Sequence, residues 1–372
     1  DLAVPQGGLI VSPPRVFSRE IAPLSQTSAQ AEPARITDIP GYCHQLADQG
    51  QRAATSLCRV TGEQRTSALH RMAEALRQQA PTIQQANARD LEAGREAGLS
   101  PALLDRLELG DERIEKMARS VEQIADQPDP VGRVMDGRVL PNGIRLEKTR
   151  VPIGVVLMIF ESRPNVTCDA AALCLKSGNG VILRGGKEAR HSNHAIADCV
   201  RAGLEQAGLD ANIVQMVQTP DRQAVTELLQ LEGQIDLCIP RGGESLIKAV
   251  VDQARIPVIK HYTGNCHTYV DETIDADNAL EVCLNAKTQR YGVCNATETF
   301  LVHRAQAERG WLKQLCEKLT EAGVEIRGDE TTQRCCDGAR PAAEQDWHEE
   351  FLDAVVAIRV VESIEEAIEH IN

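Results

Sequence analysis

The chain has 372 residues, which is too long for one ordinary hydrophobic core and fits two domains. Its formal net charge of −14 argues against a nucleic-acid partner, because polyphosphate binding needs a basic stripe and none is present. No apolar run reaches the roughly 18 residues that a membrane span needs, so no membrane partner is expected either.

The beginning of the chain differs in composition from the remainder. Residues 1–40 carry six prolines together with serine, glutamine and alanine, which predicts a flexible leader. From residue 41 to about 127, apolar residues recur at three- and four-residue spacings, and Ser100 followed by Pro101 supplies a helix start. We expect a helical zone that packs on later parts of the chain.

A β-hairpin is expected over residues 131–150. Its centre is Asn142-Gly143, a dipeptide that favours the tight turn between two antiparallel strands. The alternating polar and apolar residues suit a ribbon that projects and pairs with another subunit, although an ordinary surface hairpin fits the pattern equally well.

From residue 152, apolar strands alternate with amphipathic segments of helix length. Strands are expected at 154–160, 180–183, 213–217, 235–239 and 257–259. This rhythm predicts an α/β fold with a Rossmann-like parallel sheet, helices on both faces and ligands at the carboxyl ends of the strands.

A second, smaller α/β unit is expected from residue 264 to residue 372. Its strands are expected near 268–270, 299–302 and 355–360. Its helices are expected near 276–287, near 305–322 and from 364 onward.

Two glycine-containing loops follow strands of the first sheet, although the GxGxxG dinucleotide motif is absent. In the first, Arg184, Gly185, Gly186 and Lys187 combine two cations with bare backbone amides next to a helix start. Such a loop can bind phosphate, particularly a 2′-phosphate on adenosine ribose; the alternative is a solvated turn.

The second loop contains Arg241, Gly242 and Gly243, again between an apolar strand and a helix. Its glycines would let a pyrophosphate or nicotinamide approach the helix N-terminus, with Arg241 as a charge partner. After the first strand of the same sheet, Arg163 suits a phosphoryl or carboxylate group, and Asn165 can either cap a helix or donate to an oxyanion.

The twelve cysteines are irregularly spaced and include no CxxC pair, so we expect reduced thiols, a cytoplasmic protein and no metal site. Cys294 differs from the others because it lies on a short loop between a helix-like and a strand-like segment. A thiol held there is reachable by substrate and suits a nucleophile, whereas the alternative is a half-buried small hydrophobe.

Several motifs together carry a resemblance that runs from about residue 36 to residue 372. They are VPIGVV at 151–156, FESRPNVT at 160–167, LKSGN at 175–179, LRGG at 183–186, IPRGG at 239–243, GNCH at 264–267, NAKTQR at 285–290 and VCNATET at 293–299. In this order and spacing, they resemble the γ-glutamyl phosphate reductase family of the aldehyde dehydrogenase superfamily.

The resemblance implies NADPH-dependent reduction of L-glutamate 5-phosphate to L-glutamate 5-semialdehyde with release of phosphate, the second step of proline biosynthesis. It implies an NADPH-binding domain over residues 41–130 and 151–263, an oligomerisation hairpin over 131–150 and a catalytic domain over 264–372. A homo-oligomer is expected. A glutamate 5-kinase partner is plausible chemically, because acyl phosphates hydrolyse readily and benefit from direct transfer.

The resemblance also implies roles for individual residues. Cys294 matches the nucleophile of the family, in a Tyr-Gly-Val-Cys context where Pro-Ser-Val-Cys is usual. Asn165 is the candidate oxyanion donor, and Glu350 resembles the residue that holds the nicotinamide ribose. The residues expected to bind the substrate are Arg163, Arg290, Lys287 and Asn295; Lys287 can also be read as a solvated helix end.

Two other functions remain open at this point. The chain could oxidise a small aldehyde, although residues 261–267 lack the glutamate that hydrolytic relatives use as a base. It could instead be a catalytically silent regulatory subunit, because the family's chain continues beyond this point into a glycine-rich segment and a terminal strand. Activity of the full-length gene product distinguishes these possibilities.

Overall fold

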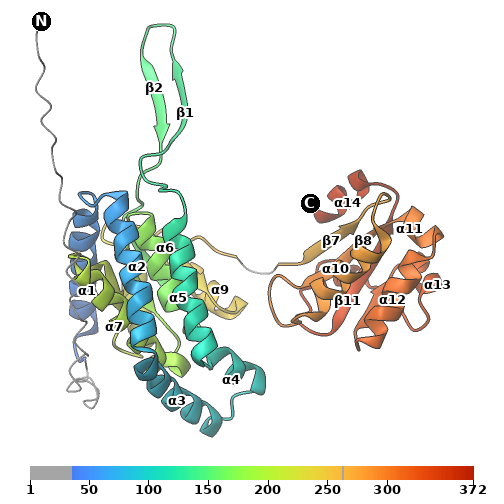
Figure 1. Ribbon diagram of the computed structural model, residues 1–372, viewed down its shortest axis with the longest axis horizontal. Coiled ribbons are helices and arrows are strands. Elements are labelled where there is room, and N and C mark those ends of the chain that lie inside the picture. The colour runs from blue at the N-terminus through green and yellow to red at the C-terminus, as the bar shows by residue number, and fades with distance from the viewer. Residues whose placement is uncertain (1–35, 262–263) are drawn as a thin grey trace, which may run out of the picture.

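The computed structural model describes residues 36–261 and 264–372, which form two α/β lobes and a projecting hairpin (Figure 1). The leader expected over residues 1–40 lies almost wholly outside the described residues. Within the described part of the chain, no helix is both long enough and apolar enough to cross a membrane.

The helical zone before the hairpin is present as predicted. Its helices are α1 (Ile39–Leu57), α2 (Gly62–Gln78), α3 (Ala80–Glu96), α4 (Pro101–Leu107) and α5 (Asp111–Asp126). Thr61 and Gln64 form a capping box at the start of α2, and the hydroxyl of Ser100 caps α4 as expected.

The first sheet is parallel, which confirms the α/β prediction. Its strand order is β5 (Val214–Met216), β4 (Gly180–Arg184), β3 (Val155–Phe160) and β6 (Leu237–Arg241). Residues 257–259 do not form the expected strand but only an isolated bridge between Val258 and Cys238. Pro257 has no backbone N–H to donate, which limits further pairing.

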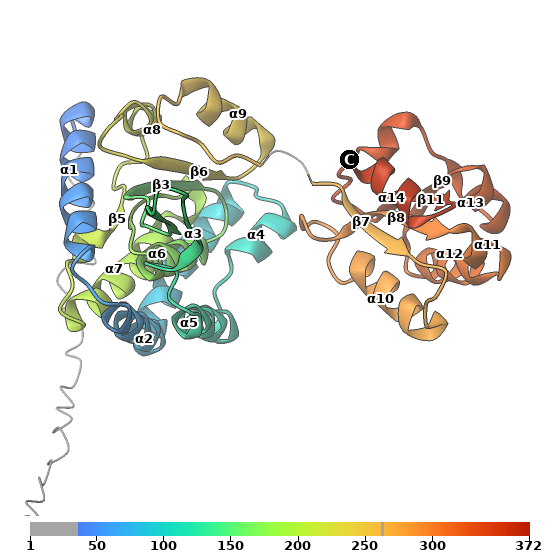
Figure 2. The ribbon, with the colours of Figure 1, turned by 90° about the horizontal axis from the view of Figure 1, so that it is seen from above.

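Helices cover both faces of this sheet (Figure 2). On one face α6 (Val166–Lys176) and α7 (Arg190–Gln206) pack with α2, α3 and α5, whereas α8 (Arg222–Leu229) and α9 (Glu244–Gln253) lie with α1 on the other. Val155, Leu157 and Ile159 face the α1 side and Phe160 faces the α6 side. Successive side chains of a strand point to opposite faces of the sheet, and helices cover both faces, so β3 is buried on both sides.

The hairpin consists of β1 (Val134–Val139) and β2 (Arg145–Thr149), paired antiparallel and exposed along their whole length. Gly143 adopts a φ of 84° in the turn, a conformation that glycine reaches without strain. Figure 1 shows the hairpin extending away from the first lobe, so the predicted element is confirmed.

The second lobe contains a five-stranded parallel sheet. Its order is β10 (Arg340–Pro341), β9 (Glu325–Gly328), β11 (Val355–Val361), β8 (Thr297–His303) and β7 (Cys266–Val270). Its helices are α10 (Ala276–Thr288), α11 (Arg304–Glu308), α12 (Trp311–Glu321), α13 (Glu330–Cys335) and α14 (Ile364–Ile371). The single helix expected near 305–322 is two helices, because Gly310 between them has a φ of 79°.

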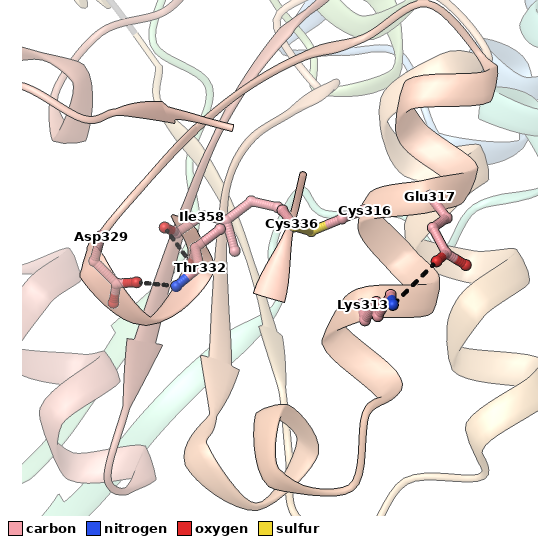
Figure 3. Close-up of a disulfide and its surroundings, with 7 residues drawn as sticks. All are labelled: Lys313, Cys316, Glu317, Asp329, Thr332, Cys336 and Ile358. Carbon is pink, nitrogen blue, oxygen red and sulfur yellow. Dashed lines mark hydrogen bonds and ion pairs between the residues drawn. A yellow bond between two sulfur atoms is a disulfide. The ribbon is translucent and has the colours of Figure 1, made fainter. Parts of the chain in front are cut away.

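The expectation that all cysteines are reduced is wrong at one place. Cys316 on α12 and Cys336 directly after α13 form a disulfide, with their Cα atoms 5.8 Å apart (Figure 3). Both side chains belong to the core of the second lobe. Packing of α12 against α13 brings the two sulfurs together, and no cysteine spacing along the chain indicates it.

Candidate active site

Cys294 lies on the loop between the end of α10 and the start of β8, as predicted, and its side chain is exposed. Arg241 at the end of β6 places its Nη2 3.5 Å from the Cys294 Sγ. A guanidinium at this distance stabilises negative charge on sulfur. Arg241, which was expected beside the cofactor, therefore also contacts the candidate nucleophile.

A second thiol lies close to this loop. The Sγ of Cys266 donates to the carbonyl oxygen of Cys294 at 3.1 Å. Burial raises the pKa of the Cys266 thiol, and the nearby Cys294 and Glu350 raise it further. The protonated form of Cys266 is thus favoured, which leaves Cys294 as the better nucleophile of the two.

Several arginines lie close to one another beside the loop that carries Cys294. Burial lowers the pKa of Arg163, and the positive charges of Arg106 and Arg241 lower it further, with Arg290 contributing and Cys294 opposing. These guanidiniums repel one another without a ligand, so the arrangement suits a substrate with more than one anionic group. Arg106 carries no motif and was not anticipated, because 186 residues separate it from its contact on the catalytic loop.

The remaining predicted substrate ligands on the loop differ in their surroundings. Arg290 is paired with Asp105 on α4 at 2.8 Å. The pKa of Asp105 lies below its ordinary value because Arg113 hydrogen-bonds to it, with Arg290 adding to the effect. Asn295 is exposed next to Cys294.

Lys287 is buried and paired within the protein. Its Nζ lies 2.6 Å from Glu298, and the two side chains are 0% and 1% exposed. The expected substrate contact and the alternative of a solvated helix end are both corrected by this burial, because the ammonium charge is already matched by a carboxylate.

Asn165 is engaged elsewhere. Its side-chain amide donates to Asp169 Oδ2 at 2.8 Å, and it makes no capping hydrogen bond at the start of α6. Asn165 itself has helical φ and ψ, which explains the missing cap. The oxyanion role expected for Asn165 is not supported by this arrangement.

The Gly242-Gly243 loop holds a carboxylate of the protein itself. The N–H of Gly243 donates to Glu161 Oε2 at 3.1 Å, and a Cβ at Gly242 would lie 2.4 Å from the same oxygen. A side chain at Gly242 would therefore displace the carboxylate of Glu161, which follows β3 in the chain and carried no signal of this contact. The carboxylate occupies the helix N-terminus that was expected to receive pyrophosphate.

The first glycine loop lines a cavity at the carboxyl end of β4. Its lining includes Arg184, Gly185, Gly186, Lys187, Arg190, Asn193 and His194 on one side and residues 216–220 on the other. A Cβ at Gly185 would lie 2.1 Å from the Asn193 side chain, which would have to move to accept any other residue. Burial lowers the pKa of Arg184, whereas Lys187 is exposed.

Glu350 lies beside the residues that lead into β7. Its Oε2 accepts a hydrogen bond from the N–H of Gly264 at 3.1 Å, and its charge acts on both Cys266 and Glu298. Glu350, which was expected to interact with the cofactor, lies 56 residues after Cys294 in the sequence. Pairing of β11 with β8 brings it near the nucleophile.

Comparisons with known proteins identify similar chains. The model of the aldehyde dehydrogenase family matches residues 42–336. The solved γ-glutamyl phosphate reductase of Thermotoga maritima is 42% identical, with a TM-score of 0.80 over 88% of this chain and 79% of that one. The γ-glutamyl phosphate reductase of Saccharomyces cerevisiae is 32% identical, with a TM-score of 0.55 over 89% of this chain and 83% of that one.

More distant relatives share the fold alone. An acetylating aldehyde dehydrogenase from Geobacillus thermoglucosidasius is 18% identical, with a TM-score of 0.60 over 89% of this chain and 78% of that one.

Proposed function

Since the chain belongs to the aldehyde dehydrogenase family, we propose that it reduces L-glutamate 5-phosphate to L-glutamate 5-semialdehyde with release of phosphate, in proline biosynthesis. The observation that carries the proposal is the exposed Cys294 thiol with arginines around it, in a chain 42% identical to a γ-glutamyl phosphate reductase. The cofactor is NADPH and the compartment the cytoplasm.

The residues around Cys294 can perform the first chemical step. The Cys294 thiolate attacks the acyl carbon, the carbon–oxygen bond to phosphate breaks, and phosphate leaves with the bonding electron pair to give a thioester. Arg241, 3.5 Å from the sulfur, and Arg163 offset the charge on the thiolate and on the departing phosphate. The backbone N–H of Cys294 is the candidate oxyanion donor, since the amide of Asn165 is engaged with Asp169.

The basic lining of the cavity after β4 supports binding of the phosphorylated part of a dinucleotide. Arg184, Lys187 and Arg190 would hold its anionic groups beside the bare backbone of Gly185 and Gly186. When bound, NADPH supplies the hydride that reduces the thioester to the aldehyde. The glutamate base of hydrolytic relatives is not needed, because water takes no part.

The reaction is tested in reverse. Glutamate semialdehyde, phosphate and NADP⁺ are mixed with the full-length protein, and reduced cofactor is followed by absorbance. We expect a rate that requires phosphate. A rate that is independent of phosphate favours the second candidate, simple aldehyde oxidation, and no rate at all favours a silent subunit.

The nucleophile is tested by Cys294→Ser. We expect kcat to fall by about 10³-fold or more, because a group that acts as the covalent nucleophile accounts for several orders of magnitude. Cys266→Ser separates the two neighbouring thiols, and Cys58→Ser is the matched control on an exposed cysteine outside the site. A Cys294→Ser enzyme with a near-normal rate contradicts the assignment.

Cofactor choice is tested by Lys187→Glu. A carboxylate at this exposed position would repel a 2′-phosphate, so we expect the ratio of kcat/KM for NADPH to that for NADH to fall about 10-fold or more. Lys116→Glu, on the exposed side of α5, is the control for the change of charge. An unchanged ratio would exclude Lys187 as the reader of the 2′-phosphate.

The assembly and the division into domains belong to the same proposal. Residues 41–130 and 151–263 would form the NADPH-binding domain, and residues 264–372 would form the catalytic domain. The hairpin would pair with a second copy of the chain. In support, Val139 is 69% exposed and Leu146 47% exposed on an otherwise unpaired ribbon. A glutamate 5-kinase would deliver the acyl phosphate. Sedimentation velocity, with and without the kinase, measures both associations.

A further inference from the structure

Arg106 links the first lobe to the catalytic loop. It lies on α4, and its Nη2 donates to the carbonyl of Gly292 at 3.1 Å, two residues before Cys294. The guanidinium is half-buried. A Cβ at Gly292 would lie 3.6 Å from the same nitrogen, so the space beside Arg106 is bounded by the loop that carries the nucleophile.

The position of α4 is fixed by buried hydrogen bonds. The Asn87 side chain, 3% exposed, donates to the carbonyl of Leu107 at 2.7 Å and accepts from the N–H of Leu109 at 2.9 Å. These bonds hold the end of α4 one residue after Arg106. Because both partners are backbone groups, the geometry does not depend on a flexible side chain at the helix end.

The carboxylate next to Arg106 in the chain is already paired with other arginines. Asp105 is already shared by Arg113 at 2.6 Å and Arg290 at 2.8 Å. Within residues 36–261 and 264–372, neither Arg106 nor Arg163 forms an ion pair with a carboxylate. Two partly buried guanidiniums that repel each other gain most from an anion supplied by a ligand.

Arg241 and Arg106 contact different parts of the loop that carries Cys294. Arg241 contacts the Cys294 sulfur directly, so it belongs to the acyl phosphate end, whereas Arg106 contacts the loop two residues earlier. We propose that Arg106 binds the α-carboxylate of the glutamyl substrate and so determines specificity for substrates that carry this group. The assignment rests on the proposed function. A bidentate guanidinium–carboxylate contact would provide the selectivity.

The test compares two aldehydes that differ only in the carboxylate. Glutamate semialdehyde and 4-aminobutanal are assayed with phosphate and NADP⁺ in the wild type and in Arg106→Gln. We expect kcat/KM for glutamate semialdehyde to fall about 10- to 100-fold, mainly through KM, as for loss of a hydrogen-bonded charge. For 4-aminobutanal, kcat/KM should stay within about 2-fold.

Further variants separate binding from folding. Arg106→Lys keeps the charge and should recover part of the loss in KM. Arg119→Gln, at an exposed position of α5, should leave kcat/KM unchanged for both aldehydes. An equal loss for both aldehydes in Arg106→Gln overturns the proposal. If Arg106→Gln does not fold, Arg106→Lys carries the test, and an unchanged ratio of the two kcat/KM values then overturns it. A wild type that lacks phosphate-dependent activity refutes the proposed function instead.

Discussion

The Lys287–Glu298 pair shows how a charged side chain beside a catalytic loop can serve the scaffold. Glu298 accepts from the Lys287 ammonium and also from the N–H of Leu352, which has a φ of 51°. Burial raises the pKa of Glu298, and the hydrogen bond from Lys287 lowers it. The pair thus holds the segment after Glu350 against β8.

Lys287→Met should lower the free energy of unfolding by about 3–5 kcal/mol, because it leaves the Glu298 carboxylate buried without a counter-ion. Urea unfolding measures this loss. The double variant Lys287→Met/Glu298→Gln should recover part of it, and Lys318→Met, which removes an exposed pair, should cost less than about 1 kcal/mol. A loss below about 1 kcal/mol for the first variant is inconsistent with the buried pair described above.

Among the helices, α2 and α7 approach each other closely at Gly203. A Cβ on Gly203 would lie 2.7 Å from the backbone N and Cα of Met72. Backbone atoms cannot rotate away as a flexible side chain does, so the two helices would have to separate. Met72, Leu76, Ile196 and Val200 are all buried in the core at this contact.

Gly203→Ala should therefore destabilise the first lobe by about 1–3 kcal/mol, the usual effect of overpacking, despite the higher helix propensity of alanine. Glu205→Ala on the exposed side of α7 is the control and should stay within about 0.5 kcal/mol of the wild type. Thermal unfolding of the two variants measures the difference. A stabilised Gly203→Ala protein would mean that the helices are not packed at this distance.

The molecule as a whole should lose stability in mild acid because several histidines are held neutral. Burial, the largest cause, lowers the pKa of His194 and of His370 to about 4 each, and it also lowers the pKa of His267. In the unfolded chain, histidine protonates near its ordinary value of about 6.5. Between these values the unfolded state binds more protons than the folded state.

The stability contributed by these histidines is therefore present above about pH 6.5 and is lost as the pH falls toward about 4. Each contributes a slope of at most about 1.4 kcal/mol per pH unit in that window. Urea midpoints at several pH values measure how steeply stability depends on pH. His194→Gln should reduce this slope, whereas His70→Gln, at an exposed position, should leave it unchanged. Stability that is constant from about pH 7 to about pH 4.5 would contradict the assigned pKa directions.

Apolar periodicity along the chain was sufficient to predict most strands of both sheets, the helical zone and the hairpin, because these depend on neighbours two to four residues apart. The same pattern placed Cys294 on a loop, because a loop between a helix and a strand is a local feature of the sequence. The division of 305–322 into two helices was missed, because a single residue, Gly310, interrupts an otherwise helical pattern.

Contacts between distant segments were not accessible in the same way. Arg106 reaches Gly292, Arg241 reaches Cys294, Glu161 fills the Gly242-Gly243 loop and Cys316 meets Cys336 only after the elements have packed. Residue type indicates which chemistry a side chain can perform. Which partner it meets, and whether that partner is substrate, solvent or another side chain, depends on packing across the lobes, because charge and burial act through space and not along the chain.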